Sequence, residues 1–485
     1  MFLGIDLGTS GVKAVITSPA GDVLAQSTSP LSVDRPRELW SEQDPADWLA
    51  ATDRAVMMLD RDLRAGVLAI GLAGQMHGAV LLGADDRPLR PAILWNDGRS
   101  FAECEELESA EPRSREITGN IAMPGFTAPK LLWVRRNEPD LFRRVRTVLL
   151  PKDYLRLELT GDKASEMSDA AGTLWLDVAR RGWSDRMLAA CGLDRLAMPA
   201  LLEGSAVTGS LRTGVAERWG MQRVPVVAGG GDNAAAAAGV GVIGEGDALL
   251  SLGTSGVTFV ATREFRPNPA RAVHAFCHCL PGMWHQMAVH LSAAACIDWA
   301  GRQLGLEGPA DVLRAAADAP PGTGPEIFLP YLSGERTPFN DPHVRAGWLR
   351  LDHDTDPARL AASVLEGIAF GLADGLDALR EAGSHVDELV MVGGGARSTA
   401  WGRIISSVLQ ARLIYIEGGD IGPALGAARL AQLGVEPGAA EDICRRPAIT
   451  AVVEPDDDLH DLLSAKRRIY QAVSASVRAT SGRHR

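Results

Sequence analysis

Short apolar runs, which are typical of buried strands, alternate along the chain with stretches that are typical of helices. Short apolar runs bounded by glycine, proline or charged residues predict buried strands over residues 67–72, 79–82, 226–228 and 388–392. Stretches without proline predict helices over Asn233–Ala238 and Thr399–Gln410, with Ser398 as the N-cap of the second. Strands that alternate with helices in this way are typical of an α/β fold.

The two ends of the chain carry different patterns. Residues 2–5, 12–17 and 23–27 are rich in apolar and β-branched residues, and turn residues separate them at Gly8–Gly11 and Pro19–Asp22. This pattern predicts a β-meander and hence a mixed sheet. The last segment, Ser474–Arg485, is small, polar and basic, and we expect it to fray.

One six-residue sequence occurs twice, 245 positions apart. Leu7–Val12 and Leu252–Val257 both read Leu-Gly-Thr-Ser-Gly-Val, and each lies between an apolar strand and a β-rich one. Chance repetition of a glycine turn is the alternative, but it does not account for the matching context. The repeat predicts two halves of related topology, with domains at residues 1–244 and 245–485 that meet in the glycine-rich stretch Gly241–Asp247.

Composition and charge exclude several classes of protein. Of the 485 residues, 46% are hydrophobic and 23% are charged, and the net charge is −12, which disfavours binding to nucleic acid or to an anionic membrane. The N-terminus lacks the basic region of a signal peptide, and no run approaches the roughly 18 apolar residues that span a bilayer. Six cysteines are too few for a disulfide framework, and Cys277 and Cys279 lack a second ligand pair at zinc spacing. We therefore predict a cytoplasmic protein.

Four glycine-rich turns are the first sign of chemistry. They lie at residues 8–11, 229–231, 253–256 and 393–395. Such turns let backbone N–H groups approach phosphate oxygens, so several of them in two related halves indicate a phosphate clamp. The chain contains no Gly-Lys pair and therefore no P-loop, and the G-x-G-x-x-G match at Gly239–Gly244 follows a helix instead of the strand that dinucleotide binding requires.

Two aspartates adjoin these turns. Asp6 precedes the first turn, where a carboxylate beside a phosphate requires a cation between them, and partly hydrated Mg²⁺ is the natural choice. Asp232 follows the second turn and begins a predicted helix. It is either the N-cap of that helix or a general base that accepts a proton from a hydroxyl attacking a phosphoryl group, and the local sequence leaves both readings open.

Hydrogen-bonding groups beside flat aromatic rings are how proteins hold sugars and polyols. Gln75 and His77 lie between two predicted strands, and Trp95 and Asp97 follow shortly after. These four residues are candidates for a sugar site, although a lone histidine is more often structural.

The motifs resemble those of the FGGY carbohydrate kinases, which share the ATPase fold of actin and the heat-shock chaperones. Asp6–Lys13 is similar to the first phosphate motif of the family, Gly125–Val134 to its first signature, and Gly393–Ser398 with Gly418–Gly426 to its second. Other segments resemble the subgroup that phosphorylates D-xylulose, namely residues 40–45, 74–78, 93–99, 151–154, 229–233 and 331–338. The resemblance extends from residue 1 to about residue 435.

The resemblance implies two ribonuclease-H-like domains that flank a deep cleft, with sugar on the N-terminal domain and ATP on the C-terminal one. It implies transfer of the γ-phosphoryl group of ATP to D-xylulose, with Asp232 as general base, Met76 and His77 against the sugar, and Asp6 at a Mg²⁺ ion, through water. The nucleotide and its phosphates are expected at Thr9, Ser10, Lys13, Gly253, Thr254, Ala294, Gly393, Gly394 and Gly395. It further implies a homodimer.

Three other functions are compatible with parts of this pattern. A sister kinase for ribulose, gluconate or glycerol would keep the mechanism, although Met76 and His77 argue against glycerol because glycerol kinases carry Arg-Glu at that pair. A nucleotide clamp without enzymatic activity would need no base at Asp232. A sugar-responsive regulator would need a DNA-binding element, and no helix-turn-helix pattern or basic face indicates one.

Overall fold

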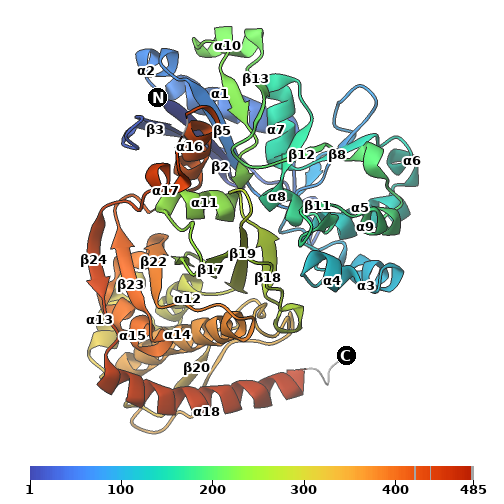
Figure 1. Ribbon diagram of the computed structural model, residues 1–485. Coiled ribbons are helices and arrows are strands. Elements are labelled where there is room, and N and C mark those ends of the chain that lie inside the picture. Colours follow the sequence, from blue (N-terminus) through green and yellow to red (C-terminus); the bar gives the residue numbers. More distant parts are fainter. Residues whose placement is uncertain (420–421, 437, 482–485) are drawn as a thin grey trace.

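The chain folds around two seven-stranded mixed sheets (Figure 1). The computed structural model describes residues 1–419, 422–436 and 438–481. The N-terminal sheet has the order β13 (Val207–Ser210), β14 (Pro225–Val227), β5 (Ala69–Gly74), β1 (Phe2–Leu7), β2 (Gly11–Thr17) and β3 (Val23–Pro30), and β15 (Gly230–Gly231) also pairs with β5. The C-terminal sheet has the order β18 (His274–Cys277), β19 (Trp284–His290), β17 (Gly256–Thr262), β16 (Ala248–Leu252), β22 (Glu388–Val392), β23 (Arg412–Ile416) and β24 (Ile449–Val453).

The two sheets share one topology around the repeated sequence. In the N-terminal sheet, the hairpin of β1 and β2 is antiparallel, β3 continues it antiparallel, and β5 and β14 extend the other side in parallel. In the C-terminal sheet, β16, β17, β19, β22 and β23 repeat these pairings in the same directions. The prediction of two related halves is therefore confirmed, and each copy of the repeat forms the turn of a central hairpin.

Most of the predicted elements are present with small shifts in their ends. The three N-terminal strands form, the run at residues 67–72 becomes β5, and the run at 388–392 becomes β22. The run at residues 79–82 becomes β6 (Val80–Leu82), which pairs with β8 (Thr147–Leu149) outside both large sheets. Helix α15 (Thr399–Leu409) begins after Ser398, whose hydroxyl accepts the backbone N–H of Trp401, as predicted for an N-cap.

The C-terminal segment is the one element for which the sequence prediction was wrong. Helix α18 (Asp457–Ser481) continues through Ser474 and lies along the C-terminal domain (Figure 1). Ser474 is buried, and its hydroxyl lies 2.9 Å from the Tyr331 hydroxyl, which also lies 2.8 Å from that of Tyr470. Small polar residues therefore continue the helix here because one face of α18 packs on the domain. Residues 482–485 lie outside the described residues.

Two helices occupy the junction between the sheets. Helix α11 (Asp232–Val240) follows β15, and α16 (Gly422–Val435), from the C-terminal half of the chain, packs on β1, β5 and α11 (Figure 1). The approach is so close that a methyl group at Gly426 would overlap the Ala235 carbonyl, and one at Gly71 would overlap that of Ala427. Small residues thus bring the backbones into direct contact.

The G-x-G-x-x-G match at Gly239–Gly244 lies at the end of α11. Gly241 ends α11 in the left-handed conformation, so the G-x-G-x-x-G match is a helix end followed by a turn. Over the described ranges, none of the helices combines the length and the apolar character that a membrane span needs. Positions 420 and 421 of the second signature lie outside the described residues.

Candidate active site

The predicted site residues of the N-terminal half converge because their strands are parallel. β1 and β15 both pair in parallel with β5, with Asp6 opposite Ala73 and Gly231 opposite Gly74. The carboxyl ends of three strands therefore meet at one edge of the sheet. Asp6, the Gln75–His77 segment and Asp232 leave the sheet at this edge, which is where α/β proteins place their ligands.

Asp6 is a half-buried carboxylate in an unfavourable electrostatic position. One of its oxygens, Oδ1, is buried without a hydrogen-bond partner among the described residues. Burial and, to a smaller extent, the negative charge of Asp232 raise the pKa of Asp6 to about 7, against the charge of Lys13, its pairing partner on β2, which lowers it. An orphaned carboxylate oxygen beside a second carboxylate fits a site that receives a cation.

The other ligands of such a cation would have to come from water and phosphate. Across the described parts of the chain, no group of three or more histidine, cysteine, aspartate or glutamate side chains is placed to hold a metal ion. Mg²⁺ suits this arrangement, because it usually keeps several waters and binds through one or two carboxylates together with substrate phosphates.

Asp232 is the first residue of α11, and Gly231 is the N-cap. The N-cap reading of Asp232 is therefore wrong. One carboxylate oxygen, Oδ1, accepts the backbone N–H and the side-chain amide of Asn233, at 2.7 and 2.8 Å. Burial raises the pKa of Asp232 to about 6, against the two Asn233 bonds, which lower it. A carboxylate held on one side with a pKa near neutrality suits a general base.

Buried charges hold the glycine turn that carries Asp232. Arg156 donates to the carbonyl of Ala228 at 2.7 Å, and the N–H of Gly231 donates to Glu166 Oε1 at 3.1 Å and to Ser168 Oγ at 3.0 Å. These residues were missed by sequence reasoning. For Arg156 the available signal was the density of charges in the segment that forms α7 (Pro151–Thr160), a helix that is almost entirely buried. Glu166 and Ser168 lie outside α7, in β9 (Ala164–Glu166) and α8 (Met167–Ala171). Buried charged groups with several partners fix the backbone that they contact.

Met76 and His77 lie beside this turn. A methyl group at Gly231 would come within 2.9 Å of the Met76 sulfur, so the turn and Met76 are in direct contact. The His77 ring is half-buried, its Nδ1 lies 2.7 Å from the carbonyl oxygen of Gly172, and it meets the Phe126 ring edge-on at 4.8 Å. Burial lowers the pKa of His77 to about 3, so the ring is neutral and its Nδ1–H donates to the Gly172 carbonyl.

Trp95, Thr9 and Gln75 form one hydrogen-bonded chain. The indole N–H of Trp95 donates to the Thr9 hydroxyl at 2.9 Å, which donates to Gln75 Oε1 at 3.0 Å, and Gln75 Nε2 donates to Gln43 Oε1. The hydroxyl of Thr9 is therefore engaged with two predicted sugar residues. Trp95 is 44% exposed, whereas Gln75 is buried. The network joins the sugar side of the site to the phosphate hairpin.

Asp97 has a different environment from the one expected of a sugar ligand. Its carboxylate is fully buried, receives two bonds from the Arg99 guanidinium at 2.7 and 2.9 Å, and accepts the backbone N–H of Ser41 at 2.6 Å. Arg99 in turn stacks over the Trp40 ring at 3.6 Å. The contacts of Asp97 are those of a structural ion pair, and both of its oxygens are already engaged.

The predicted nucleotide residues of the C-terminal half also come together. At the β16–β17 turn, the N–H of Ala294, the first residue of α12 (Ala294–Leu304), donates to the Gly253 carbonyl at 3.0 Å, and the N–H of Ala293 donates to the Thr254 carbonyl at 2.9 Å. Gly253, Thr254 and Ala294 are thus neighbours. Thr254 is exposed and available to a ligand.

The Gly393–Gly395 loop follows β22 and lies against the same hairpin. Gly393 has a φ of 87°, and a methyl group at Gly395 would crowd Leu252. The loop borders a pocket of about 430 Å³, whose other walls include Thr399, Tyr415, Gly419 and Thr450. A pocket beside a glycine loop at the ends of parallel strands suits a nucleoside.

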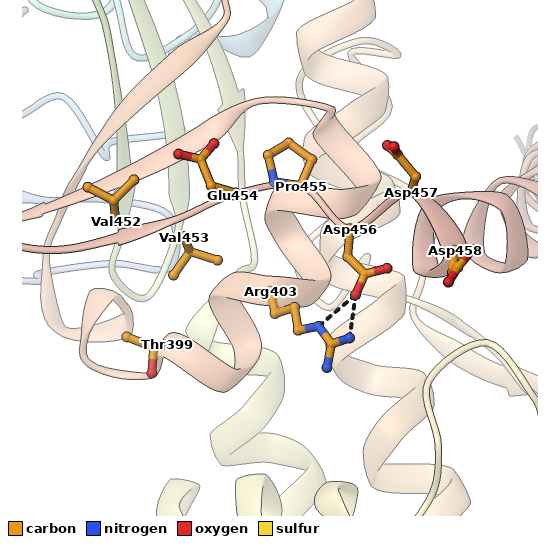
Figure 2. A pocket seen from close by; sticks show the side chains of 9 residues that line it. All are labelled: Thr399, Arg403, Val452, Val453, Glu454, Pro455, Asp456, Asp457 and Asp458. Carbon is orange, nitrogen blue, oxygen red and sulfur yellow. Dashed lines mark hydrogen bonds and ion pairs between the residues drawn. The ribbon is translucent and has the colours of Figure 1, made fainter.

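A larger hollow of about 710 Å³ lies farther along the C-terminal domain (Figure 2). It is lined by α15, β24 and the start of α18, and the Arg403 guanidinium is paired with Asp456 across it. Its remaining polar lining is mainly acidic, with Glu454, Asp457 and Asp458. Acidic walls repel phosphate, and none of the predicted site residues lines it, so this hollow is not the candidate site.

Comparisons with known proteins agree with this geometry. Models of the N-terminal and C-terminal domains of the FGGY family of carbohydrate kinases match residues 1–239 and 248–434. A xylulose kinase from Escherichia coli (strain K12) is 56% identical over 438 residues, with 90% of each chain covered, and one from Klebsiella pneumoniae is 51% identical over 480 residues, with 99% of each covered. The crystal structure of a xyloylose kinase from Brucella ovis superimposes with a TM-score of 0.96 at 47% identity and covers 99% of both chains.

Proposed function

The chain belongs to the FGGY family of carbohydrate kinases, and we propose that it transfers the γ-phosphoryl group of ATP to the C5 hydroxyl of D-xylulose, giving D-xylulose 5-phosphate and ADP. The observation that carries this proposal is the 51% identity to a xylulose kinase over 99% of the chain. The proposed role in the cell is D-xylose breakdown.

Asp232 is the proposed general base. Phosphoryl transfer needs positioning and charge stabilisation more than covalent chemistry, and one carboxylate next to the attacking hydroxyl supplies the proton acceptor. The rigid turn before Asp232 and the Asn233 bonds on one oxygen leave the other oxygen for the C5 hydroxyl. The N-terminus of α11 also favours the ionised form, because the helix dipole is positive there.

Asp6 is the proposed contact to Mg²⁺, through water. When bound, Mg²⁺ neutralises charge on the phosphates of ATP. The proposed donors for those phosphates are backbone groups of the two central hairpins, at Thr9 and Ser10 and at Thr254, and Lys13 adds positive charge beside Asp6. Gly253 shapes the second turn, because its N–H already donates to the Ser255 carbonyl at 3.0 Å. The loop Gly393–Gly395 and Ala294 are the proposed nucleoside contacts.

The proposed setting is the cytoplasm, where ATP is available and thiols stay reduced. All six cysteines are free in the structure, and five of them are buried. Burial raises the pKa values of the Cys104 and Cys191 thiols to about 12, so neither thiol is reactive at neutral pH. Homodimer formation remains a prediction from the family resemblance.

The raised pKa of Asp232 predicts the pH profile. A general base acts in its ionised form, so kcat/KM for the sugar is expected to rise with pH through about 6 and to level off above about 7. Initial rates of ADP formation between about pH 5 and 8, at saturating Mg-ATP, test this prediction. A profile that stays flat down to about pH 5 would contradict the assignment of the base.

A substrate panel tests the proposed function. Purified protein is supplied with Mg-ATP and, in parallel, D-xylulose, D-ribulose, L-ribulose, L-xylulose, D-gluconate, glycerol or no sugar, and ADP release is measured. Strong turnover with D-xylulose alone is the expected result. Turnover with another sugar would keep the kinase mechanism and overturn the substrate, because specificity can depend on few contacts. ATP binding without sugar-dependent turnover would indicate a nucleotide-binding protein without kinase activity.

A further inference from the structure

The backbone of His77 is in a conformation that its side chain disfavours. Its φ is 68°, in the left-handed region that residues other than glycine rarely adopt. Such a conformation persists only where the surroundings hold it in place, and it is concentrated at functional sites. The carbonyl oxygen of His77 accepts two hydrogen bonds, from Lys130 Nζ at 2.9 Å and from the Thr127 hydroxyl at 3.1 Å. These donors supply the restraint.

Lys130 is a buried lysine that donates hydrogen bonds to backbone carbonyls. Its side chain is fully buried, and besides His77 its ammonium donates to the carbonyl of Gly125 at 2.6 Å. Lys152, Lys163 and Lys466 form ion pairs with carboxylates, whereas in the described part of the chain Lys130 forms none. Burial lowers the pKa of Lys130 to about 7, against the negative charge of Asp97, which raises it without forming an ion pair. An ammonium is costly to bury without an ion-pair partner, so its retention here calls for a reason beyond stability.

The second acceptor of Lys130 belongs to the other side of the sugar site. A methyl group at Gly125 would lie 2.7 Å from the carbonyl oxygen of Trp95, so the Gly125 turn packs on the Trp95 backbone. Lys130 therefore joins the segment that carries His77 to the turn beside Trp95. The Gly172 carbonyl and Phe126 orient the His77 ring, while Lys130 and Thr127 hold the backbone from which that ring projects.

We propose that Lys130 is a positioning residue of the sugar pocket, which holds the His77 backbone in its left-handed conformation and thereby fixes the His77 ring against the substrate. The inference rests on the proposed function, in which His77 contacts the sugar. Lys130 itself cannot touch the substrate because its side chain is fully buried. Its effect on sugar binding is expected to pass through the His77 backbone, and the double-mutant cycle below distinguishes this route from one through the Gly125 turn beside Trp95.

Lys130→Met tests the inference, because methionine keeps the length of the side chain and removes the donor. We expect KM for D-xylulose to rise by about tenfold, which corresponds to about 1.4 kcal/mol of binding free energy, while KM for ATP is unchanged. Thr127→Val removes the weaker donor and should raise KM for the sugar by about two- to fivefold. If Lys130→Met does not fold, Thr127→Val decides by the same comparison of the two KM values.

A double-mutant cycle separates positioning from general damage. His77→Ala and the double variant with Lys130→Met should have the same KM for the sugar, because Lys130 has no effect once the His77 ring is absent. Lys466→Met is the matched control, since Lys466 is also buried and pairs with Glu366 at 2.6 Å in the C-terminal domain. It should lower thermal stability and leave KM for the sugar unchanged.

If the parent protein turns over D-xylulose, two results would overturn this inference and leave the proposed function intact. One is additivity of the two substitutions in the cycle, and the other is a rise in KM for ATP equal to that for the sugar. A parent protein that turns over no sugar would overturn the proposed function, and this inference with it. The substrate panel on the parent protein therefore precedes the variants and distinguishes the two failures.

Discussion

Asp232→Asn is expected to lower sugar-dependent turnover by about 10²- to 10⁴-fold, the range that general acid–base groups contribute. Asparagine has nearly the shape of aspartate and can retain the Asn233 contacts, so the turn and α11 should keep their structure. It cannot accept the proton from the attacking hydroxyl. KM for ATP should change little, because the proposed nucleoside contacts lie in the C-terminal domain.

The measurement is ADP release with Mg-ATP and D-xylulose, together with a thermal unfolding curve. Asp185→Asn is the matched control, because Asp185 is also the first residue of a helix, α9 (Asp185–Ala190), and is exposed. The control should keep nearly full turnover. Retention of more than a few percent of activity by the Asp232 variant would refute the general-base role. Loss of the folded state would instead reveal a structural one.

Gly426→Ala is expected to be among the most destabilising single-methyl changes in the protein. The added methyl group would overlap the carbonyl of Ala235, where α16 crosses α11, and backbone cannot yield as a flexible side chain can. Overpacking of this kind costs about 1–3 kcal/mol and occasionally more. Separation of the two helices would also displace Asp232, which begins α11, so sugar-dependent turnover should fall with stability.

Denaturant unfolding followed by circular dichroism measures this effect. Gly214→Ala is the matched control, because Gly214 lies in helix α10 (Thr213–Trp219) with open space around the position of a Cβ. Alanine has the higher helix propensity, so the control should be as stable as the parent or more stable. If Gly426→Ala and Gly214→Ala both unfold at the parent's midpoint, the contact between α16 and α11 is not as close as the structure indicates.

Local sequence was sufficient to predict an element wherever the residues of one short segment determine its structure. The two Leu-Gly-Thr-Ser-Gly-Val hairpins, the strand that ends at Val392 and the helix capped by Ser398 depend on turn residues and short apolar runs, and each forms as predicted. The candidate site rested on the glycine turns beside Asp6 and Asp232 together with the family resemblance. In the structure the carboxyl ends of parallel strands meet at one edge, which brings Asp6, His77 and Asp232 together.

The tertiary structure decided what each polar side chain contacts. Asp97 was a reasonable sugar ligand by its neighbours, but Arg99 and the backbone of Ser41 engage both of its oxygens. Ser474 was expected in a frayed tail, but a hydrogen bond to Tyr331, 143 positions away, holds it in a packed helix.

The partners of a buried polar group usually come from distant segments, so a local pattern cannot reveal whether such a group is free for a ligand or already satisfied. Glu166 and Lys130 illustrate this limit, since they reach the backbone of Gly231 and His77 from 65 and 53 positions away. The sequence by itself determined the two related halves and indicated the residues that are proposed to carry the chemistry. Only the folded chain decided which buried charges hold those residues in place, because burial makes an unpaired polar group costly and so selects its partners across the whole structure.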